Sequence, residues 1–298
     1  MNTPFFSHFR VVDLPLKVST VHAEVGGNGP PVLLLHGYPQ THVAWHRIAS
    51  DLAREFTVVA PDLRGYGDSV GPKGGERHVQ YSKRAMALDA LALMKSLGFE
   101  NFAVIGHDRG GRVGYRMALD HPGAVRCFSS LTVIPTSDMW ERAGMAFGLK
   151  AYHWYLFAQP FDLPERLLAA DPAYFLRWTL QGMTKSADAV SPLALAEYDR
   201  AFARASVRHA MLEDYRAAAD IDLEHDRLDI ASGRRLQCPV QVLWSEGQTA
   251  QPNPLETWRK WADQPEGGTV LAGHLLAEEA PAEVLAWILP FLRRNMPR

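Results

Sequence analysis

Short runs of apolar residues recur along the chain, and segments with helical periodicity alternate with them. Near-continuous apolar runs of this length are typical of strands buried on both faces of a sheet. Two intervening segments, 46–55 and 81–98, carry apolar residues at helical spacing, and the second ends at Gly98, as a helix often does. This alternation predicts an α/β fold with a mostly parallel sheet. The predicted strands are residues 31–37, 57–63, 102–108, 125–134, 239–246 and 267–273.

The alternation stops between residues 137 and 225. This segment is rich in Trp, Tyr, Phe, Leu, Ala and Arg with helical periodicity, and it contains no convincing strand. We therefore expect a helical cap, 137–225, inserted into a core made of residues 1–136 and 226–298. A chain of 298 residues is long enough to bury a core of this size.

Composition narrows the class of partner. A formal net charge of −2 gives no general electrostatic basis for binding nucleic acid, and no basic run or long apolar stretch suggests a membrane. Cys127 and Cys238 lie in apolar segments without metal-ligand spacing, so we expect free thiols in a reducing compartment. The N-terminus lacks a secretory pattern, and we expect a cytoplasmic protein with a small-molecule partner and no metal or organic cofactor.

The stretch "GHDRG", residues 106–110, follows one predicted strand and opens a helix. A small-x-nucleophile-x-small sequence at such a turn holds the central side chain at the carboxyl edge of the sheet. Here the central residue is Asp108, and a carboxylate in that position can displace a leaving group from saturated carbon and form an enzyme ester. The alternative is that Asp108 only caps the following helix, as aspartate often does.

Two further motifs favour the catalytic interpretation. "LLLHGYPQ" follows an early predicted strand, and the loop after such a strand supplies one backbone N–H of an oxyanion hole. The donors would be the backbone N–H groups of Tyr38 and Arg109. His274 follows the last predicted strand, where the general base stands in this chain order.

Taken together, these motifs resemble the α/β-hydrolase superfamily, and within it the haloacetate (fluoroacetate) dehalogenases. The resemblance implies an α/β-hydrolase fold with a helical cap, an aspartate nucleophile and a homodimer. Related haloalkane dehalogenases and epoxide hydrolases usually carry Trp after the nucleophile, whereas this chain carries Arg109. The segments that carry the resemblance are "HGYPQTHVAWH", "APDLRGYGDS", "GHDRGGRVGYRMALDHP", "YHWYLFAQPFDLPERLL", "HAMLEDYRA" and "GHLLAEEAP".

Arg109 and Arg112 lie one helical turn apart beside Asp108. Cations at a helix N-terminus are disfavoured, so an anion should offset them. One candidate is a substrate carboxylate, which the resemblance implies; the other is an acid of the protein itself, Asp108 included.

A departing halide needs hydrogen-bond donors. The resemblance implies that His153, Trp154 and Tyr215 of the cap form a halide pocket. Trp154 could instead belong to the hydrophobic core of an aromatic-rich helix.

The acid that should orient His274 is missing from both usual positions. Fluoroacetate dehalogenases carry an aspartate where this chain has Thr132, and the alternative position holds Gln248. We expect Glu246 to take this role, with Asp138 or no acid at all as the alternatives. Glu278 and Glu279 follow His274 closely on a predicted helix, so we expect them to form its solvated first turn.

The sequence thus predicts a hydrolase that acts on short 2-haloacids through an ester of Asp108. Its partner would be a small anionic halogenated substrate. An epoxide hydrolase is one alternative, because Tyr152, Tyr155 or Tyr215 could protonate an epoxide oxygen. The other alternative is a ligand-binding relative that has lost turnover.

Overall fold

The computed structural model describes residues 5–186, 188–246 and 253–297. In these residues an eight-stranded sheet has the order β1-β2-β4-β3-β5-β6-β7-β8. β1 and β2 pair antiparallel, as do β2 and β4, and every other neighbouring pair is parallel. The mostly parallel sheet expected from the sequence is confirmed. The strands are β1 Arg10–Pro15, β2 Thr20–Gly26, β3 Pro31–Leu35, β4 Thr57–Pro61, β5 Phe102–His107, β6 Val125–Leu131, β7 Val240–Ser245 and β8 Glu266–Val270.

The six predicted strands correspond to β3 through β8. β3 to β7 are almost wholly buried, as their continuous apolar runs predicted. The two N-terminal strands were not predicted. β1 lies at the edge of the sheet and is half exposed, so its sequence lacks a buried run that would identify it.

Helices of the core pack beside this sheet. α2 covers most of the segment 81–98 and ends before Gly98, whose positive φ of 85° suits glycine. The segment 46–55 forms only the single helical turn α1, which is shorter than predicted. The core helices are α1 Ala49–Leu52, α2 Lys83–Ser96, α3 Arg109–Asp120, α12 Pro254–Trp258, α13 Leu276–Glu279 and α14 Pro281–Asn295, with 3₁₀ helices His42–Trp45 and Glu76–Tyr81.

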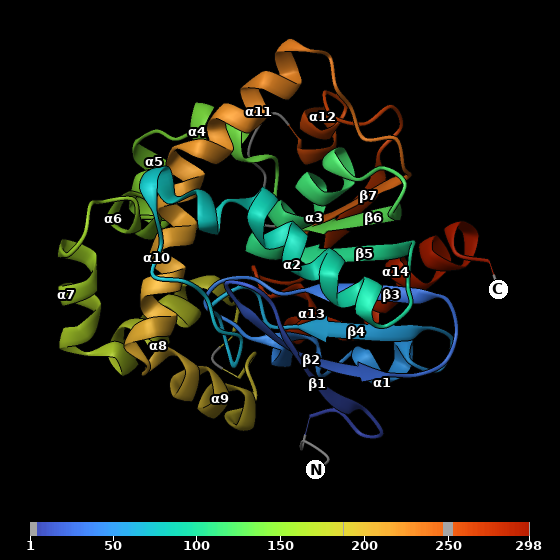
Figure 1. The fold of residues 1–298 in the computed structure, drawn as a ribbon, viewed down its shortest axis with the longest axis horizontal. Coiled ribbons are helices and arrows are strands. Elements are labelled where there is room, and N and C mark those ends of the chain that lie inside the picture. The colour runs from blue at the N-terminus through green and yellow to red at the C-terminus, as the bar shows by residue number, and fades with distance from the viewer. Residues whose placement is uncertain (1–4, 187, 247–252, 298) are drawn as a thin grey trace.

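Between β6 and β7 the described residues form helices and no strand. Figure 1 shows α6 to α9 grouped on one side of the molecule, with α10 running between them and the sheet. Because β6 ends where this segment begins, the helices lie over the carboxyl end of the sheet. They are α4 Thr136–Glu141, α5 Met145–Lys150, α6 His153–Phe157, α7 Leu163–Ala170, α8 Pro172–Met183, α9 Pro192–Phe202, α10 Ala205–Ala219 and α11 Ile221–Ala231.

None of the described helices combines the length and apolar character needed to cross a bilayer. Both cysteines are free; Cys127 is buried and Cys238 only partly so.

Candidate active site

The turn between β5 and α3 holds Asp108 in a backbone conformation that few non-glycine residues adopt. Its φ is 48° and its ψ −114°, a strained geometry that costs roughly 1–3 kcal/mol. A Cβ on Gly110 would lie 2.1 Å from the carbonyl oxygen of Leu35, and one on Gly37 would lie 2.4 Å from Cβ of Asp108. Small residues are therefore a steric requirement of the turn. The Asp108 side chain makes no capping hydrogen bond to α3, which argues against the capping alternative.

The carboxylate of Asp108 has two differently placed oxygens. Oδ1 accepts a hydrogen bond of 2.9 Å from the backbone N–H of Tyr38, while Oδ2 lies 3.5 Å from Nε2 of His274. Burial alone would raise the pKa of Asp108, but His274 and Arg109 outweigh it and hold this pKa well below the usual range. The carboxylate is thus ionised, as a nucleophile must be. The Arg109 N–H remains a predicted second oxyanion donor.

Arg109 is completely buried. Most of its guanidinium N–H groups donate to Asp214, a residue that was not predicted from the sequence. Its Nε and Nη2 donate to the two oxygens of Asp214 at 2.8 and 2.7 Å. Lys83 also binds Asp214. Nη1 of Arg109 is buried without a partner among the described residues. The residues three and four positions from Asp214 on α10, which share its face of the helix, are all Ala or Met. A lone carboxylate on such an apolar face was the signal for a buried ion pair.

Arg112 has different surroundings. Its Nη1 donates to neutral acceptors only, the carbonyl oxygen of Ile134 at 3.0 Å and Oγ1 of Thr136 at 3.2 Å. Its Nε is buried and has no partner within the described part of the chain. Burial and the neighbouring charge of Arg109 lower the pKa of Arg112. An arginine with such a shortage of acceptors is suited to receive an anion.

The three residues expected in a halide pocket lie together. The rings of His153 and Trp154 lie 5.7 and 5.5 Å from the ring of Tyr215. The guanidinium of Arg109 is 4.1 Å from the centre of the Tyr215 ring, and that of Arg112 is 4.7 Å from the Trp154 ring. Both arginines therefore border this aromatic group.

Two of these aromatic residues offer a hydrogen-bond donor. Burial lowers the pKa of His153 to about 4, so its imidazole is neutral at pH 7 and carries one N–H. The Tyr215 hydroxyl is buried with no hydrogen-bond partner in the described residues. Burial also raises the pKa of Tyr215 well above its usual value, which keeps the hydroxyl protonated.

No ion pair joins His274 to either of the expected acids among the described residues. Glu246 is 62% exposed and its carboxylate lies 3.9 Å from Nζ of Lys185. Asp138 is buried, but its two oxygens accept hydrogen bonds from Lys260 and Trp261, each at 2.7 Å. Among the described residues the only ion pair recorded for His274 is with Asp108. Gln248 lies outside the described residues, and the role expected of Glu246 stays a prediction.

Thr132, at the position usual for the acid, adopts a φ of 63°. Its hydroxyl donates 2.8 Å to the carbonyl oxygen of Leu131, and its backbone N–H donates to that of Leu243. The hydroxyl and the backbone N–H of Thr132 are thus both used in hydrogen bonds at the end of β6.

The expectation that Glu278 and Glu279 form a solvated turn is wrong. Glu278 is 1% exposed and accepts hydrogen bonds from Gln40 at 2.6 Å and Tyr198 at 3.1 Å. Burial raises the pKa of Glu278 to about 8. Glu279 is half-buried and binds two backbone N–H groups, those of Leu275 and Lys185. Helical periodicity could not reveal most of these contacts, because Gln40, Tyr198 and Lys185 come from distant segments.

One group of described residues has metal-ligand chemistry: His22, His42 and Asp62, whose ligand atoms lie within 4.8 Å of one another. Its carboxylate is already occupied. Oδ1 of Asp62 accepts from the backbone N–H and Nδ1 of His42 at 2.7 and 2.9 Å, and Oδ2 accepts from the N–H of Asp68. These hydrogen bonds hold the segment that follows β4 in place.

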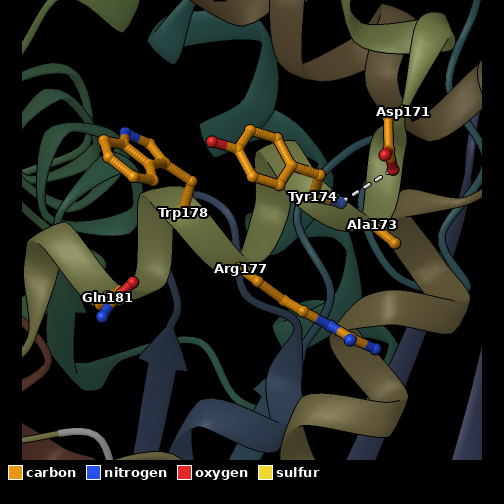
Figure 2. A pocket seen from close by; sticks show the side chains of 6 residues that line it. All are labelled: Asp171, Ala173, Tyr174, Arg177, Trp178 and Gln181. Atoms are coloured by element: carbon orange, nitrogen blue, oxygen red, sulfur yellow. Dashed lines mark hydrogen bonds between the residues drawn. The ribbon is translucent and has the colours of Figure 1, made fainter.

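A cavity of about 430 Å³ opens on the outer surface of the cap (Figure 2). It is a shallow hollow along α8, and Figure 2 shows Tyr174 and Trp178 projecting beside each other from that helix. None of its lining residues belongs to the group around Asp108. The candidate active site is therefore the buried group of Asp108, Arg109, Arg112 and His274, and not this cavity. The lining residues are Asp171, Ala173, Tyr174, Arg177, Trp178 and Gln181.

Comparison with known proteins defines the class and then the family. The α/β hydrolase fold family matches residues 30–281. A fluoroacetate dehalogenase of Burkholderia sp. is 46% identical over 224 residues, which cover 75% of this chain and 73% of that protein. The chain therefore belongs to the α/β-hydrolase fold family and, within it, to the haloacetate dehalogenase family.

Other relatives carry a different activity in their names. A soluble epoxide hydrolase of Corynebacterium sp. (strain C12) is 32% identical over 279 residues, or 91% of this chain and 93% of that protein. A solved structure of a provisionally named epoxide hydrolase from Pseudomonas aeruginosa is 53% identical, with a TM-score of 0.95 over 99% of this chain and 98% of that one. The comparisons thus show that this chain is a hydrolase. These relatives are named either for cleaving a carbon–halogen bond or for opening an epoxide.

Proposed function

We propose that this hydrolase cleaves the carbon–halogen bond of short 2-haloacids such as haloacetate. One observation carries the proposal: Arg109 and Arg112, next to the ionised nucleophile Asp108, keep buried N–H groups that have no partner among the described residues. A buried donor without an acceptor costs about 1–3 kcal/mol, more when it is charged, so a ligand with acceptor oxygens would relieve it. A carboxylate substrate has such oxygens, and its α-carbon would then face Asp108.

In the first half-reaction Oδ2 of Asp108 attacks the α-carbon. The carbon–halogen bond breaks, and the halide leaves with the bonding electron pair. The charge that gathers on the halide would be stabilised by the N–H groups of His153 and Trp154 and the hydroxyl of Tyr215.

In the second half-reaction His274 takes a proton from water, which attacks Cγ of the ester. Negative charge then develops on Oδ1, the oxygen that already accepts a hydrogen bond from the Tyr38 N–H. Collapse of this intermediate releases the hydroxy acid and leaves Asp108 as a carboxylic acid, which loses the second proton of the water to solvent and becomes a carboxylate again. The hydroxyl oxygen of the product comes from Asp108, and its proton returns from His274.

Epoxide hydrolysis is the second candidate, supported by the names of two relatives and by the Tyr215 hydroxyl, which has no hydrogen-bond partner among the described residues. Of the other two cap tyrosines considered, Tyr155 is 39% exposed and packs against Trp140 and Phe147. Tyr152 packs against Phe175. A neutral epoxide would also offer no anionic partner to Nη1 of Arg109 and Nε of Arg112, which have none among the described residues. These contacts favour the haloacid.

The test is a comparison of chloride release from chloroacetate with diol formation from glycidol by the same preparation. We expect chloride release that is at least about tenfold more efficient than glycidol opening, since the arginine contacts are available only to the acid. Preferential opening of glycidol would favour the epoxide hydrolase, and turnover of neither compound would favour a ligand-binding relative.

A further inference from the structure

His274 is held through its backbone. Its N–H donates 2.6 Å to the carbonyl oxygen of Met183, at the end of the cap helix α8. Its carbonyl oxygen accepts 2.8 Å from Nε2 of His107, the residue before the nucleophile. Burial lowers the pKa of His107 to about 3, so this ring is neutral and Nε2 carries its proton. Hydrogen bonds thus connect the backbone of His274 both to the cap and to the turn that carries Asp108.

Glu279 joins the same two parts of the molecule with one carboxylate. Its Oε1 accepts 3.1 Å from the N–H of Leu275, next to His274, and its Oε2 accepts 2.8 Å from the N–H of Lys185 in the cap. Glu279 therefore connects the loop that carries His274 to the segment that follows α8.

Sterics at Gly273 provide independent evidence that this junction is tight. A Cβ there would lie 2.6 Å from the carbonyl oxygen of Met183, 2.7 Å from Oε1 of Glu279 and 2.9 Å from the backbone nitrogen of Lys185. Two of these atoms are backbone and cannot move without shifting the cap segment. The loop and the cap meet at a separation that only glycine permits.

We propose that Glu279 is a positioning residue for His274, acting as a clip between the loop 273–275 and the cap segment 183–185. The inference rests on the proposed function, because it assigns the clip to the step in which His274 activates water. Among the described residues the His274 ring has no ion-paired acid besides the nucleophile Asp108, so its orientation depends more on its backbone. Displacing the loop should therefore slow hydrolysis of the ester and leave the attack of Asp108 nearly unchanged.

The experiment measures chloride release from chloroacetate by Glu279→Ala, with first-turnover and steady-state rates recorded separately. We expect a first-turnover rate within about twofold of wild type and a steady-state rate lower by about tenfold or more, because small misplacements of a catalytic group have effects of this size. Glu279→Gln keeps one acceptor oxygen and should be intermediate.

Glu283→Ala is the matched control. Glu283 also accepts from a backbone N–H of this region, that of Leu271 at 3.0 Å, but the bond does not reach the cap. Both rates should stay near wild type in this variant. An equal fall of both rates in Glu279→Ala, or an equal effect of Glu283→Ala, would show a merely structural role and overturn the proposal.

Amide hydrogen exchange tests the clip without turnover. Exchange in peptides covering 183–185 and 273–275 should accelerate in Glu279→Ala and Glu279→Gln but not in Glu283→Ala, whose lost hydrogen bond affects Leu271. If wild type releases no chloride, the proposed function fails while this comparison still tests the clip. Unchanged exchange in the Glu279 variants would refute the clip itself. If Glu279→Ala does not fold, Glu279→Gln carries both measurements.

Discussion

Arg109 and Arg112 carry the same charge on one turn of α3, yet their partners differ. Asp214 binds Arg109 with both oxygens, whereas Arg112 donates to a carbonyl and a hydroxyl. The charge of Arg109 is therefore largely compensated within the protein, and that of Arg112 is not. Their spacing in the sequence predicted two arginines beside Asp108, but nothing local could predict this division, because Asp214 lies about a hundred residues away.

The first prediction concerns Arg112→Lys. Lysine keeps the charge but loses the planar fork that matches a carboxylate, so KM for chloroacetate should rise by about tenfold or more. Arg109→Lys would also break the paired bonds to Asp214, and it should lower thermal stability as well as activity. Steady-state kinetics and melting curves of both variants would check this. A KM for Arg112→Lys equal to that of wild type would remove Arg112 from the substrate site.

The second prediction concerns the buried carboxyl of Glu278. Its pKa in the folded chain, about 8, exceeds its ordinary value of 4.5, so the folded state binds more protons between these pH values. The free energy of unfolding should then fall as pH rises through this window, by an amount on the order of a few kcal/mol. Glu278→Gln should flatten the decline between pH 6 and pH 9 in urea unfolding, and Glu283→Gln should not. Parallel declines in wild type and Glu278→Gln would contradict the assignment.

At the scale of elements, the best-predicted part is the strand–turn–helix unit formed by β5 and α3. An apolar run, small residues at 106 and 110, and a helical pattern behind them are all local signals, and the structure gives a steric reason for both glycines. The end of β6 is different. Thr132 follows that strand as expected, but whether an acid reaches His274 depends on segments that meet only in three dimensions.

The third prediction follows from Thr132. An orienting carboxylate helps His274 hold its working tautomer and carry positive charge, which matters most when water attacks the ester. Among the described residues that ring has no ion-paired acid besides Asp108 itself, so wild type should release a rapid burst of chloride, about one per active site, before a slower steady state. Thr132→Asp should raise the steady-state rate and shrink the burst. Rapid-quench measurements with no burst in wild type would indicate an orienting group, and Glu246→Gln would test whether it is Glu246.

At the scale of the whole molecule, the cap carries a partly apolar outer face. Tyr174 and Trp178 are 62% and 56% exposed and stack at 6.1 Å on α8, and Leu163 and Leu167 of α7 are also exposed. Large apolar side chains exposed in this way often mark a protein interface. The sequence predicted helices here by their periodicity, but periodicity alone does not distinguish a face covered by the core from one left outside.

The fourth prediction is that this face of α7 and α8 joins two copies of the chain, in keeping with the homodimer that the family resemblance implies. Trp178→Arg should convert a dimer to a monomer in sedimentation velocity without lowering the melting temperature of the fold. Leu228→Arg, at a position 60% exposed on α11, is the control and should remain dimeric. A monomeric wild type, or a dimer indifferent to Trp178→Arg, would contradict this interface.

The central claim is that Asp108 forms an ester whose carbonyl carbon is then attacked by water. It is tested most directly by a single turnover of chloroacetate, with enzyme in excess, in water labelled with heavy oxygen. The account predicts that the label enters the carboxylate of the peptide containing Asp108 and that the first glycolate carries unlabelled oxygen from the enzyme. Label in that glycolate, with none in the Asp108 peptide, would mean direct attack of water on the substrate and would contradict the account.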